Sequence, residues 1–389
     1  MPDKNLVFMV AGEPSGDLLG GRLIEALKAE SSDELRLAGI GGPAMESQGL
    51  HSIFPMQELS LMGLMEIAPH IPRLLRRLNE TAEAVMRLNP SIVVTIDSPG
   101  FTFRLAKRIR HLRVPIVHYV APQIWAWRPQ RAFKIAQFVD HIMALLPFEP
   151  EFFDRYGIDC TYVGHPAIEQ GYNRGDGDAF RRRKNVPADA IILALLPGSR
   201  RGEIDRLLPV YRDALALLSD RTKDLAAVVP TTGAMHQHVA EMVCSWKMRT
   251  ILVPGSAEQP DAYAACDAAI TKSGTSTLHL ALARVPMVVC YRVNPVTAFF
   301  GRRLINVSHV ALANLLTDNP VVPELLQERC TAENVAREIG GLLNDPRVRM
   351  QQLASFKQVA EKLDTAGKAP SKRAAELVLH QLAKRGSAE

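Results

Sequence analysis

A loop of small and hydroxylated residues in the second half of the sequence has the composition of a phosphate-binding turn. It lies between the apolar run 268–270 and the helix-like segment 278–283, and it consists of Ser273, Gly274, Thr275, Ser276 and Thr277. A strand that turns through such residues into a helix directs backbone N–H groups and hydroxyls at one spot, beside the positive end of the helix dipole. The pattern favours a bound diphosphate, although an ordinary capped helix after a strand uses the same residue types.

A second loop repeats this arrangement earlier in the same half. It follows the apolar run 191–196 and contains Ser199 and Arg200. A guanidinium can pair with two phosphate oxygens at once through parallel hydrogen bonds. Because two loops of one kind occur together, we predict that they bind the same diphosphate.

An aspartate follows a strand-like run in the first half of the sequence. Asp97 comes directly after the apolar run 92–96 and before a Pro-Gly turn. A carboxylate held there could take a proton from a hydroxyl nucleophile. Aspartate is also common at turns for structural reasons, so the spacing leaves both roles open.

The first strand-like run, 6–11, leads into a tight turn that contains Glu13 and Ser15. The turn lacks the Gly-x-Gly-x-x-Gly dinucleotide fingerprint, and its acidic residues would repel a pyrophosphate. We therefore predict that this turn binds the acceptor or closely approaches the other domain. The alternative is that Ser15 or Asp17 only caps the helix that follows.

Two further segments carry candidate binding residues. Trp125 lies in the aromatic stretch 119–128, which ends in an arginine, so its ring could stack on a sugar, border an acyl chain or pack at a domain interface. His165 follows the last strand-like run of the first half. A single histidine there is more often a hydrogen-bonded hinge residue than a catalyst.

The segment 59–78 interleaves apolar and basic residues in a way that suits an anionic membrane surface. Buried helix packing would explain its leucines equally well, but not its clustered arginines. The predicted membrane patch comprises Leu61, Met62, Leu64, Met65, Arg73, Leu74, Arg76 and Arg77.

The composition is that of a folded, water-soluble chain. Of its 389 residues, 47% are apolar and 22% are charged, and the formal net charge is +5. No apolar stretch approaches the roughly 18 residues that span a bilayer, so we expect no transmembrane helix and a cytoplasmic location. The 5 cysteines are scattered, which argues against a disulfide framework or a zinc site. We expect neither a bound metal nor a nucleic-acid partner.

Short β-rich runs alternate with helix-like segments almost throughout the chain. The runs lack strict polar alternation, as expected for strands buried on both faces of a parallel sheet. They cover residues 6–11, 35–40, 92–96, 115–120, 141–145, 191–196, 225–229, 250–253, 268–271 and 286–293. The predicted fold class is α/β, with two Rossmann-like domains facing each other across a cleft. We place these domains at residues 1–170 and 171–360, with a helix over 361–389 that returns to the first.

A set of motifs occurs in order between about residue 5 and about residue 330, and together they resemble the lipid-A-disaccharide synthase family. They are Ala11–Asp17, Gly41–Pro43, Ile96–Pro99, Tyr119–Arg128, Gly164–Pro166, Leu196–Arg200 and Ser273–Thr275. Each motif alone is weak, but the ordered set is highly specific.

The resemblance implies an inverting glycosyltransferase of the B-type fold that needs neither a metal nor another cofactor. It would transfer 2,3-diacylglucosamine from its UDP derivative to the 6-hydroxyl of 2,3-diacylglucosamine 1-phosphate, forming the β-1,6-linked lipid A disaccharide 1-phosphate and UDP. The first domain would bind the acceptor and the inner face of the inner membrane, and the second would bind the UDP-sugar. The sequence leaves a homodimer open.

The resemblance also assigns roles to residues. Asp97 matches the family's essential aspartate and is the candidate base. The nucleotide-side residues of the family match Arg200, Asn314, Glu324 and Gln327.

Two positions depart from the family pattern. His279 stands where members usually have a glutamate, which in B-type glycosyltransferases commonly binds the ribose hydroxyls. A histidine can still hydrogen-bond a hydroxyl, so we expect UDP binding to be retained. Gly100 stands where an acidic residue often follows the Asp97 turn.

Two alternatives stay open at this stage. One is a cytosolic enzyme of the same fold acting on a soluble nucleotide sugar, such as a UDP-N-acetylglucosamine 2-epimerase, which would not need the membrane patch. The other is a membrane-peripheral protein that binds a nucleotide sugar without turning it over.

Overall fold

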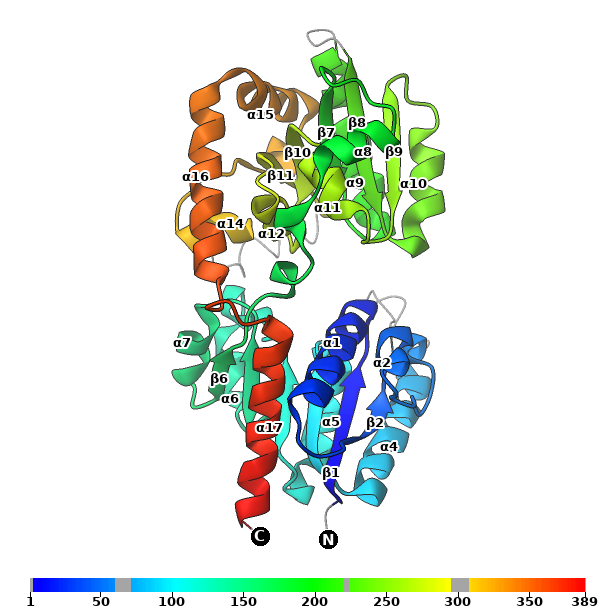
Figure 1. Ribbon diagram of the computed structural model, residues 1–389, viewed down its shortest axis with the longest axis vertical. Helices are drawn as coiled ribbons and strands as arrows, with labels where there is room; N and C mark the ends of the chain where they lie inside the picture. Colours follow the sequence, from blue (N-terminus) through cyan, green and yellow to red (C-terminus); the bar gives the residue numbers. More distant parts are fainter. Residues whose placement is uncertain (1–2, 60–70, 220–223, 295–307, 389) are drawn as a thin grey trace. The chain divides into compact units, whose positions relative to one another are not determined.

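Figure 1 shows a computed structural model of the chain, which describes residues 3–59, 71–219, 224–294 and 308–388. The chain folds into two compact units. Unit 1 comprises Met1–Pro166 and Thr365–Glu389, and unit 2 comprises Ala167–Asp364. The sequence places the corresponding boundaries after residues 170 and 360.

Unit 1 is built on a parallel sheet with the strand order β2-β1-β3-β4-β5-β6. The strands are β1 (Asp3–Ala11), β2 (Arg36–Ile40), β3 (Pro90–Ile96), β4 (Ile116–Tyr119), β5 (His141–Ala144) and β6 (Asp159–Tyr162). Every residue of β3 is buried, which is why its sequence is apolar without alternation.

The helices of unit 1 come from both of its chain segments. They are α1 (Pro14–Glu30), α2 (Pro43–Ser47), α4 (Ile71–Leu88), α5 (Pro99–Ile109), α6 (Ala132–Ile135), α7 (Glu149–Asp154) and α17 (Pro370–Ala388), with the short 3₁₀ helices η1 (Met56–Glu58), η3 (Arg110–Leu112), η4 (Gln123–Ala126) and η5 (Pro129–Arg131). The C-terminal helix α17 packs against α1. The Lys372 ammonium on α17 forms an ion pair with the Glu30 carboxylate on α1 at 2.8 Å. Val378 of α17 lies in the same apolar core as β1 and β3.

Unit 2 contains a second parallel sheet, with the order β12-β11-β10-β7-β8-β9. The strands are β7 (Ile191–Leu196), β8 (Leu225–Thr231), β9 (Arg249–Pro254), β10 (Ala268–Lys272), β11 (Met287–Tyr291) and β12 (Glu324–Leu326). The two parallel α/β units confirm the fold class predicted from the sequence. The cleft expected between them stays a prediction.

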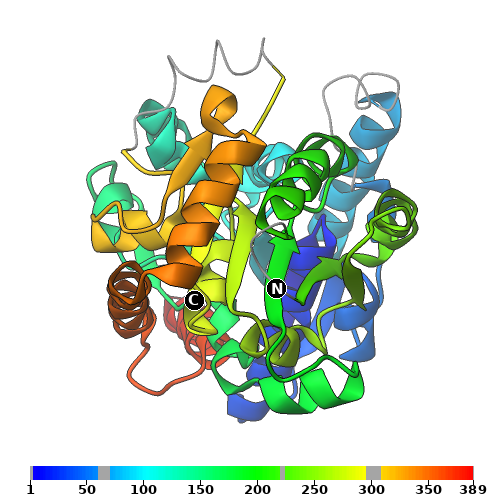
Figure 2. The ribbon, with the colours of Figure 1, turned by 90° about the horizontal axis from the view of Figure 1, so that it is seen from above.

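Helices cover both faces of the sheet in unit 2 (Figures 1 and 2). They are α8 (Gly177–Arg183), α9 (Arg201–Ser219), α10 (His236–Val243), α11 (Gln259–Ala264), α12 (Ser276–Leu282), α14 (Leu312–Thr317), α15 (Ala332–Asn344) and α16 (Pro346–Leu363), with the 3₁₀ helices η6 (Pro166–Ile168), η7 (Tyr172–Arg174), η8 (Gly233–Met235) and η9 (Gln327–Arg329). The helices α9 and α15 share an apolar core with β7 and β10, whereas α12 and α14 pack against α16.

In each unit, all strands run in one direction, so their carboxyl ends share one edge of the sheet. Ligands of open α/β sheets bind at this edge. In the described ranges, no helix combines the length and the apolarity that crossing a bilayer requires.

Candidate active site

Asp97 sits in an unusual turn at the carboxyl end of β3. Both Asp97 and Ser98 adopt left-handed backbone angles, with φ of 49° and 46°. The Asp97 N–H donates to the Tyr119 carbonyl at 2.9 Å, and the Thr102 hydroxyl donates to the Asp97 carbonyl at 2.8 Å. Two consecutive non-glycine residues in this region cost free energy, and such strain is typical of functional sites.

The surroundings of Asp97 favour a proton acceptor. Burial raises the pKa of its carboxyl, and the backbone N–H of Ser98 opposes the rise only in part. A carboxylate whose pKa is raised binds a proton more readily than one in water. The side chain is nevertheless half-buried rather than fully enclosed, so a substrate hydroxyl can approach it.

The turn that contains Glu13 and Ser15 lies next to the Asp97 turn. A Cβ atom at Gly12 would lie 2.6 Å from the Ser98 hydroxyl oxygen, so only glycine permits this approach. Glu13 is half-buried just before α1 without capping that helix through its side chain, and Ser15 is exposed. The sequence-predicted acceptor turn and the predicted base therefore share one edge of one sheet.

Asp17, the last residue of the motif Ala11–Asp17, has a structural role that the sequence did not reveal. From α1 it accepts hydrogen bonds from the backbone N–H groups of Gly42, Ala44 and Met45, at 2.8, 2.9 and 3.0 Å. These groups begin α2. Asp17 thus joins two helices and is itself almost fully buried.

Trp125 is held by a carboxylate that sequence reasoning missed. Its indole N–H donates to Glu149 Oε1 at 3.2 Å, and Glu149 Oε2 accepts from the N–H groups of Leu145 and Leu146. Phe148 packs edge-on against the indole. Glu149 is almost fully buried, and burial raises its pKa to about 7. The only sequence signal was an acidic residue shortly after a strand.

His165 is also buried, at the point where the chain leaves β6. The preceding Gly164 has φ of 106°, and a Cβ there would lie 2.6 Å from Thr365 and 2.9 Å from Pro370. His165 therefore stands where the first segment of unit 1 meets the returning C-terminal segment. This position suits a residue that packs where these two segments of the chain meet.

Gly100, which also departs from the family pattern, is exposed in the first turn of α5. An added Cβ at Gly100 would meet no atom within 4 Å among the described residues. The absence of an acidic side chain at this position is therefore not imposed by packing.

In unit 2, the loop after β7 places Ser199 and Arg200 at the carboxyl edge of the sheet. Glu203, in the first turn of α9, accepts a hydrogen bond from the Ser199 N–H at 3.3 Å and one from the Arg200 guanidinium at 3.4 Å. It also pairs with Lys272 at 3.0 Å. Glu203 and Lys272 were not predicted as site residues.

The loop after β10 has a different arrangement from the one its composition suggested. The Ser273 hydroxyl donates to the Val310 carbonyl at 2.6 Å, and the Thr277 hydroxyl donates to the Gly274 carbonyl at 2.8 Å. These two hydroxyls fasten the loop. Thr275 is exposed and Ser276 begins the short helix α12. Gly274 has φ of 145°, which favours glycine.

Asn314 and Glu324 hold the same backbone segment from the other side. Glu324 accepts hydrogen bonds from the N–H groups of Val310 and Ala311 and from the Asn314 amide. Asn314 is buried, and it both donates to and accepts from the Val322 backbone, at 2.8 and 2.9 Å. Together with Ser273, these residues fix the position of Val310.

The Gln327 side chain forms hydrogen bonds with the backbone of Val293. With its amide oriented to satisfy both ends, its nitrogen donates to the Val293 carbonyl at 3.3 Å and its oxygen accepts from the Val293 N–H at 3.2 Å. Gln327 itself has φ of 49°. Asn314, Glu324 and Gln327, three of the nucleotide-side residues suggested by the family resemblance, thus position backbone segments at the edge of the sheet.

His279 lies on α12 in a stack of three rings. Its ring centroid is 4.2 Å from that of Tyr172, and Tyr172 stacks at 5.5 Å on Tyr263. Burial lowers the pKa of His279 to about 4, so the imidazole is neutral near pH 7. A neutral ring can still donate or accept one hydrogen bond to a hydroxyl. Tyr172 comes from the segment between the two sheets and was not predicted.

The predicted membrane patch is described only in part. Leu61, Met62, Leu64 and Met65 lie outside the described residues. On α4, Arg77 bonds Glu58 at 2.6 and 2.7 Å and Glu80 at 2.6 Å, and Arg73 also bonds Glu58. These arginines lower the pKa of Glu58 to about 2. Part of the arginine cluster therefore has an intramolecular partner, which the sequence argument did not foresee.

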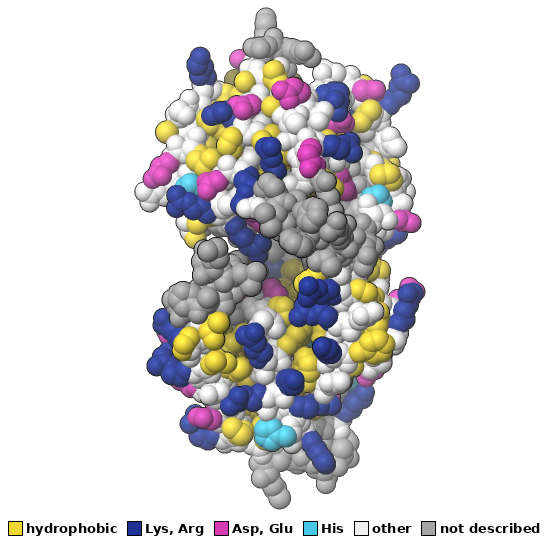
Figure 3. Space-filling view, turned by 180° about the vertical axis from the view of Figure 1, so that it is seen from behind, with side chains coloured by type: hydrophobic (Ala, Val, Ile, Leu, Met, Phe, Trp, Pro, Cys, Tyr) yellow, Lys and Arg dark blue, Asp and Glu magenta, His cyan; other side chains and the backbone are white. Residues whose placement is uncertain are grey.

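The described part of the segment 59–78 exposes apolar as well as basic side chains. Ile71 is 46% exposed and Leu75 is 50% exposed, and Arg76 is exposed beside them, whereas Leu74 is partly buried. The face of unit 1 seen in Figure 3 mixes basic and hydrophobic side chains, with few acidic ones.

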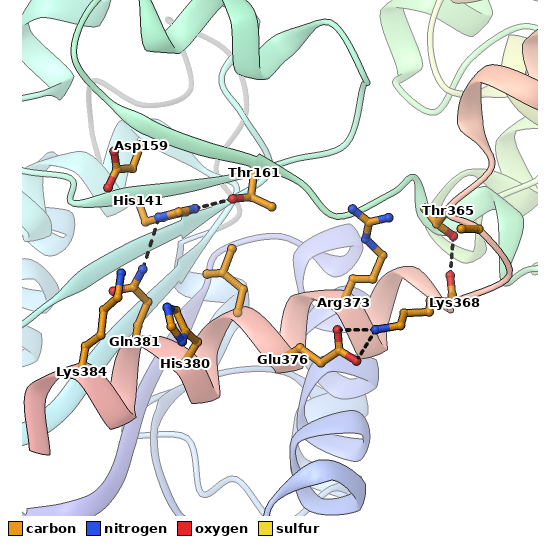
Figure 4. Close-up of a pocket in the computed structure, with 12 residues that line it drawn as sticks. His141, Asp159, Thr161, Thr365, Lys368, Arg373, Glu376, His380, Gln381 and Lys384 are labelled. Atoms are coloured by element: carbon orange, nitrogen blue, oxygen red, sulfur yellow. Dashed lines mark hydrogen bonds and ion pairs between the residues drawn. The ribbon is translucent and has the colours of Figure 1, made fainter. Parts of the chain in front are cut away.

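A separate hollow of about 660 Å³ runs along β6 beneath α17 (Figure 4). It reaches the amino ends of β5 and β6, away from Asp97. Its polar groups bond one another: His141 with Thr161 and Gln381, and Lys368 with Glu376. Among the described residues, no group of three or more histidine, cysteine or acidic side chains could hold a metal ion.

Comparison with known proteins decides between the open alternatives. A family model described as Lipid-A-disaccharide synthetase matches residues 7–378. The chain belongs to this family. The lipid-A-disaccharide synthase of Rhodospirillum centenum is 49% identical to this chain, over 98% of the chain and 95% of the relative. The lipid-A-disaccharide synthase of Paramagnetospirillum magneticum is 45% identical, over 96% of this chain and 97% of the relative.

Solved structures of other proteins share the fold of this chain. The UDP-GlcNAc 2-epimerase of Neisseria meningitidis bound to UDP-GlcNAc has a TM-score of 0.64 at 10% identity, covering 97% of this chain and 99% of the epimerase. A glycosyltransferase from Rickettsia africae has a TM-score of 0.60 at 12% identity, covering 99% of each chain. At these identities the likeness concerns the fold alone, so the epimerase alternative has no support from it.

Proposed function

We propose that this protein transfers 2,3-diacylglucosamine from its UDP derivative to the 6-hydroxyl of 2,3-diacylglucosamine 1-phosphate. The acceptor oxygen attacks C1 of the donor sugar as the bond from C1 to the diphosphate breaks. The products are the β-1,6-linked disaccharide 1-phosphate and UDP. Attack from the side opposite the leaving group inverts the configuration at C1.

The placement of Asp97 is the observation that best supports this proposal. The strained turn at the end of β3 holds a carboxylate whose pKa is raised by burial, next to the turn of Glu13 and Ser15. In the proposed reaction, Asp97 accepts the proton of the 6-hydroxyl while that oxygen bonds C1. The proton then passes to solvent. Glu13, Ser15, Trp125 and His165 are proposed to bind or border the acceptor.

The donor is proposed to bind at the carboxyl edge of unit 2. Ser199, Arg200 and the loop from Ser273 to Thr277 would contact the diphosphate, and His279 would contact the ribose. Asn314, Glu324 and Gln327 would act by holding the backbone at Val310 and Val293 against the nucleotide. Charge stabilisation by a guanidinium and backbone N–H groups serves a departing diphosphate in the same way as a metal ion would.

We also propose that the protein acts at the cytoplasmic face of the inner membrane as a peripheral protein. Both sugars carry acyl chains, so their ring systems lie at the lipid surface. The exposed side chains Ile71 and Leu75 with Arg76 would contact anionic lipid, since an apolar and a basic group together suit that interface. Light scattering would decide between a monomer and the homodimer that the sequence leaves open.

The decisive experiment is an assay of the purified protein in detergent micelles. It would contain UDP-2,3-diacylglucosamine and 2,3-diacylglucosamine 1-phosphate, with EDTA present, and would follow disaccharide and UDP. Disaccharide formation is the expected result. A parallel reaction with UDP-N-acetylglucosamine tests for epimerisation. Release of UDP without disaccharide, or no reaction, would overturn the proposal.

A further inference from the structure

Four polar side chains gather at the carboxyl ends of β7, β10 and β11. Arg200 and Glu203 follow β7, Lys272 ends β10 and Tyr291 ends β11. These strands are neighbours in the sheet, with Thr271 paired to Leu196 and Lys272 paired to Cys290. The cluster therefore stands at the edge where an α/β sheet binds its ligand.

Glu203 is the centre of the cluster, and both of its oxygens are engaged. Oε1 lies 3.0 Å from Lys272 Nζ and 3.4 Å from the Arg200 guanidinium, and Oε2 accepts from the Ser199 N–H. A Cβ at Gly198 would lie 2.3 Å from Oε2, so glycine is needed for the loop to pass this carboxylate. Glu203 thus bonds two cations and the backbone of the loop after β7.

The balance of charge in the cluster is positive. Two cations share one carboxylate, and the fourth member, Tyr291, is neutral because burial raises its pKa, an effect that Glu203 increases and Arg200 reduces. The Lys272 ammonium also lies 6.0 Å from the centre of the Tyr291 ring. The Lys272 side chain is 22% exposed, compared with 60% for the Arg200 side chain. A partly desolvated cation with a shared counter-ion attracts an anion more strongly than a fully solvated one.

We propose that Lys272 is a second phosphate-binding cation of the donor site, held in place by Glu203 and acting beside Arg200 on the diphosphate of UDP. This inference rests on the proposed function, because it takes UDP as the ligand of this edge. Lys272 would contact the diphosphate oxygens in the bound donor and would stabilise the charge that develops on UDP as it leaves.

The competing explanation is that Lys272 only neutralises Glu203. The two explanations differ in what happens when both charges are removed. If the lysine serves the carboxylate alone, adding Lys272→Met to Glu203→Gln should not weaken UDP binding further. If the lysine binds phosphate, the double variant Lys272→Met/Glu203→Gln should bind UDP more weakly than Glu203→Gln does.

The test measures binding of UDP and of uridine to the full chain by titration calorimetry and ligand-observed NMR. Lys272→Met should weaken UDP binding about 10-fold, the usual effect of one charge-assisted contact. Uridine binding should not change, because uridine has no phosphate. Lys272→Arg should restore most of the UDP affinity, and the loss in Lys272→Met should shrink at high salt.

The matched control is Lys184→Met. Lys184 pairs with Glu258 at the same distance of 3.0 Å and has a similarly shielded side chain, 30% exposed, but it lies at the end of α8. Its replacement should leave UDP affinity unchanged. Melting temperatures of all variants would show whether each one is folded.

Two results would overturn the inference: unchanged UDP affinity in Lys272→Met, or equal UDP affinities of the double variant and Glu203→Gln. Either would leave the proposed function intact if the unmodified protein makes disaccharide. Conversely, a protein that binds UDP through Lys272 but makes no disaccharide would disprove the proposed function and retain the phosphate site.

Discussion

The indole N–H of Trp125 donates to a carboxylate oxygen of Glu149 at 3.2 Å, which ties the loop after β4 to the turn after β5. Glu149 accepts two further hydrogen bonds, both from backbone N–H groups of that turn. All three partners are donors, so the contact favours the ionised carboxylate, whereas burial opposes it and raises the pKa to about 7.

Replacing Glu149 should therefore disturb both the loop and the pH dependence of stability. Glutamine offers one acceptor and one donor, so Glu149→Gln must direct an N–H₂ group at an N–H donor. We expect KM for the acceptor to rise several-fold with a smaller change in kcat. Steady-state kinetics with each substrate varied in turn would measure this, and an unchanged KM would show that Trp125 does not need Glu149.

Glu149→Gln should also change how the free energy of unfolding depends on pH. The folded pKa of Glu149 lies above the ordinary glutamate value of 4.5, so the native state binds more protons than the unfolded state between these values. Stability from this group is thus highest below pH 4.5 and falls by about 3 kcal/mol as the pH rises to 7. Urea unfolding at several pH values should show this slope in the unmodified protein and a reduced slope in Glu149→Gln.

Asp97→Asn should lower kcat by about 10²- to 10⁴-fold, the usual contribution of a general base, and leave UDP binding intact. Since burial raises the pKa of Asp97, the variant should be at least as stable as the unmodified protein. In the unmodified enzyme, kcat/KM should decline as the pH falls through this raised pKa. An unchanged rate in Asp97→Asn would remove Asp97 as the base.

Asn314→Ala should destabilise unit 2 by about 2–4 kcal/mol, because it leaves the Val322 backbone and Glu324 without their buried partner. It should also weaken UDP binding, since the Val310 segment would lose its support. The matched control on the same helix is Thr317→Val, which removes a hydroxyl that bonds the helix backbone. A drop in UDP affinity without a loss of stability would instead mean that Asn314 contacts the nucleotide directly.

Replacing Ile71 and Leu75 by serine should weaken binding to vesicles containing phosphatidylglycerol by about 10-fold, because each side chain would no longer bury apolar surface in the lipid. Cosedimentation measures this. Leu217→Ser is the control, since Leu217 is 42% exposed on α9 in unit 2. Equal binding of the double variant and the unmodified protein would remove this surface as the membrane contact.

Local patterns in the sequence were enough to predict two parallel α/β units and to single out Asp97, Arg200 and the loop from Ser273 to Thr277. Parallel strands buried on both faces need continuous apolar runs, and tight turns at their ends need particular residues. Both requirements act within a few residues along the chain. They are therefore visible without knowledge of the fold.

The partners of those residues were decided only by the tertiary structure. Lys272 meets Glu203 because β10 pairs with β7, and Arg77 bonds Glu58 because α4 packs beside η1. Asn314, suggested as a nucleotide-side residue, supports the backbone at Val322 through hydrogen bonds that its own sequence neighbours do not reveal. Hydrogen bonds and ion pairs act over about 3 Å between atoms brought together by folding, so residue type and spacing along the chain could not assign them.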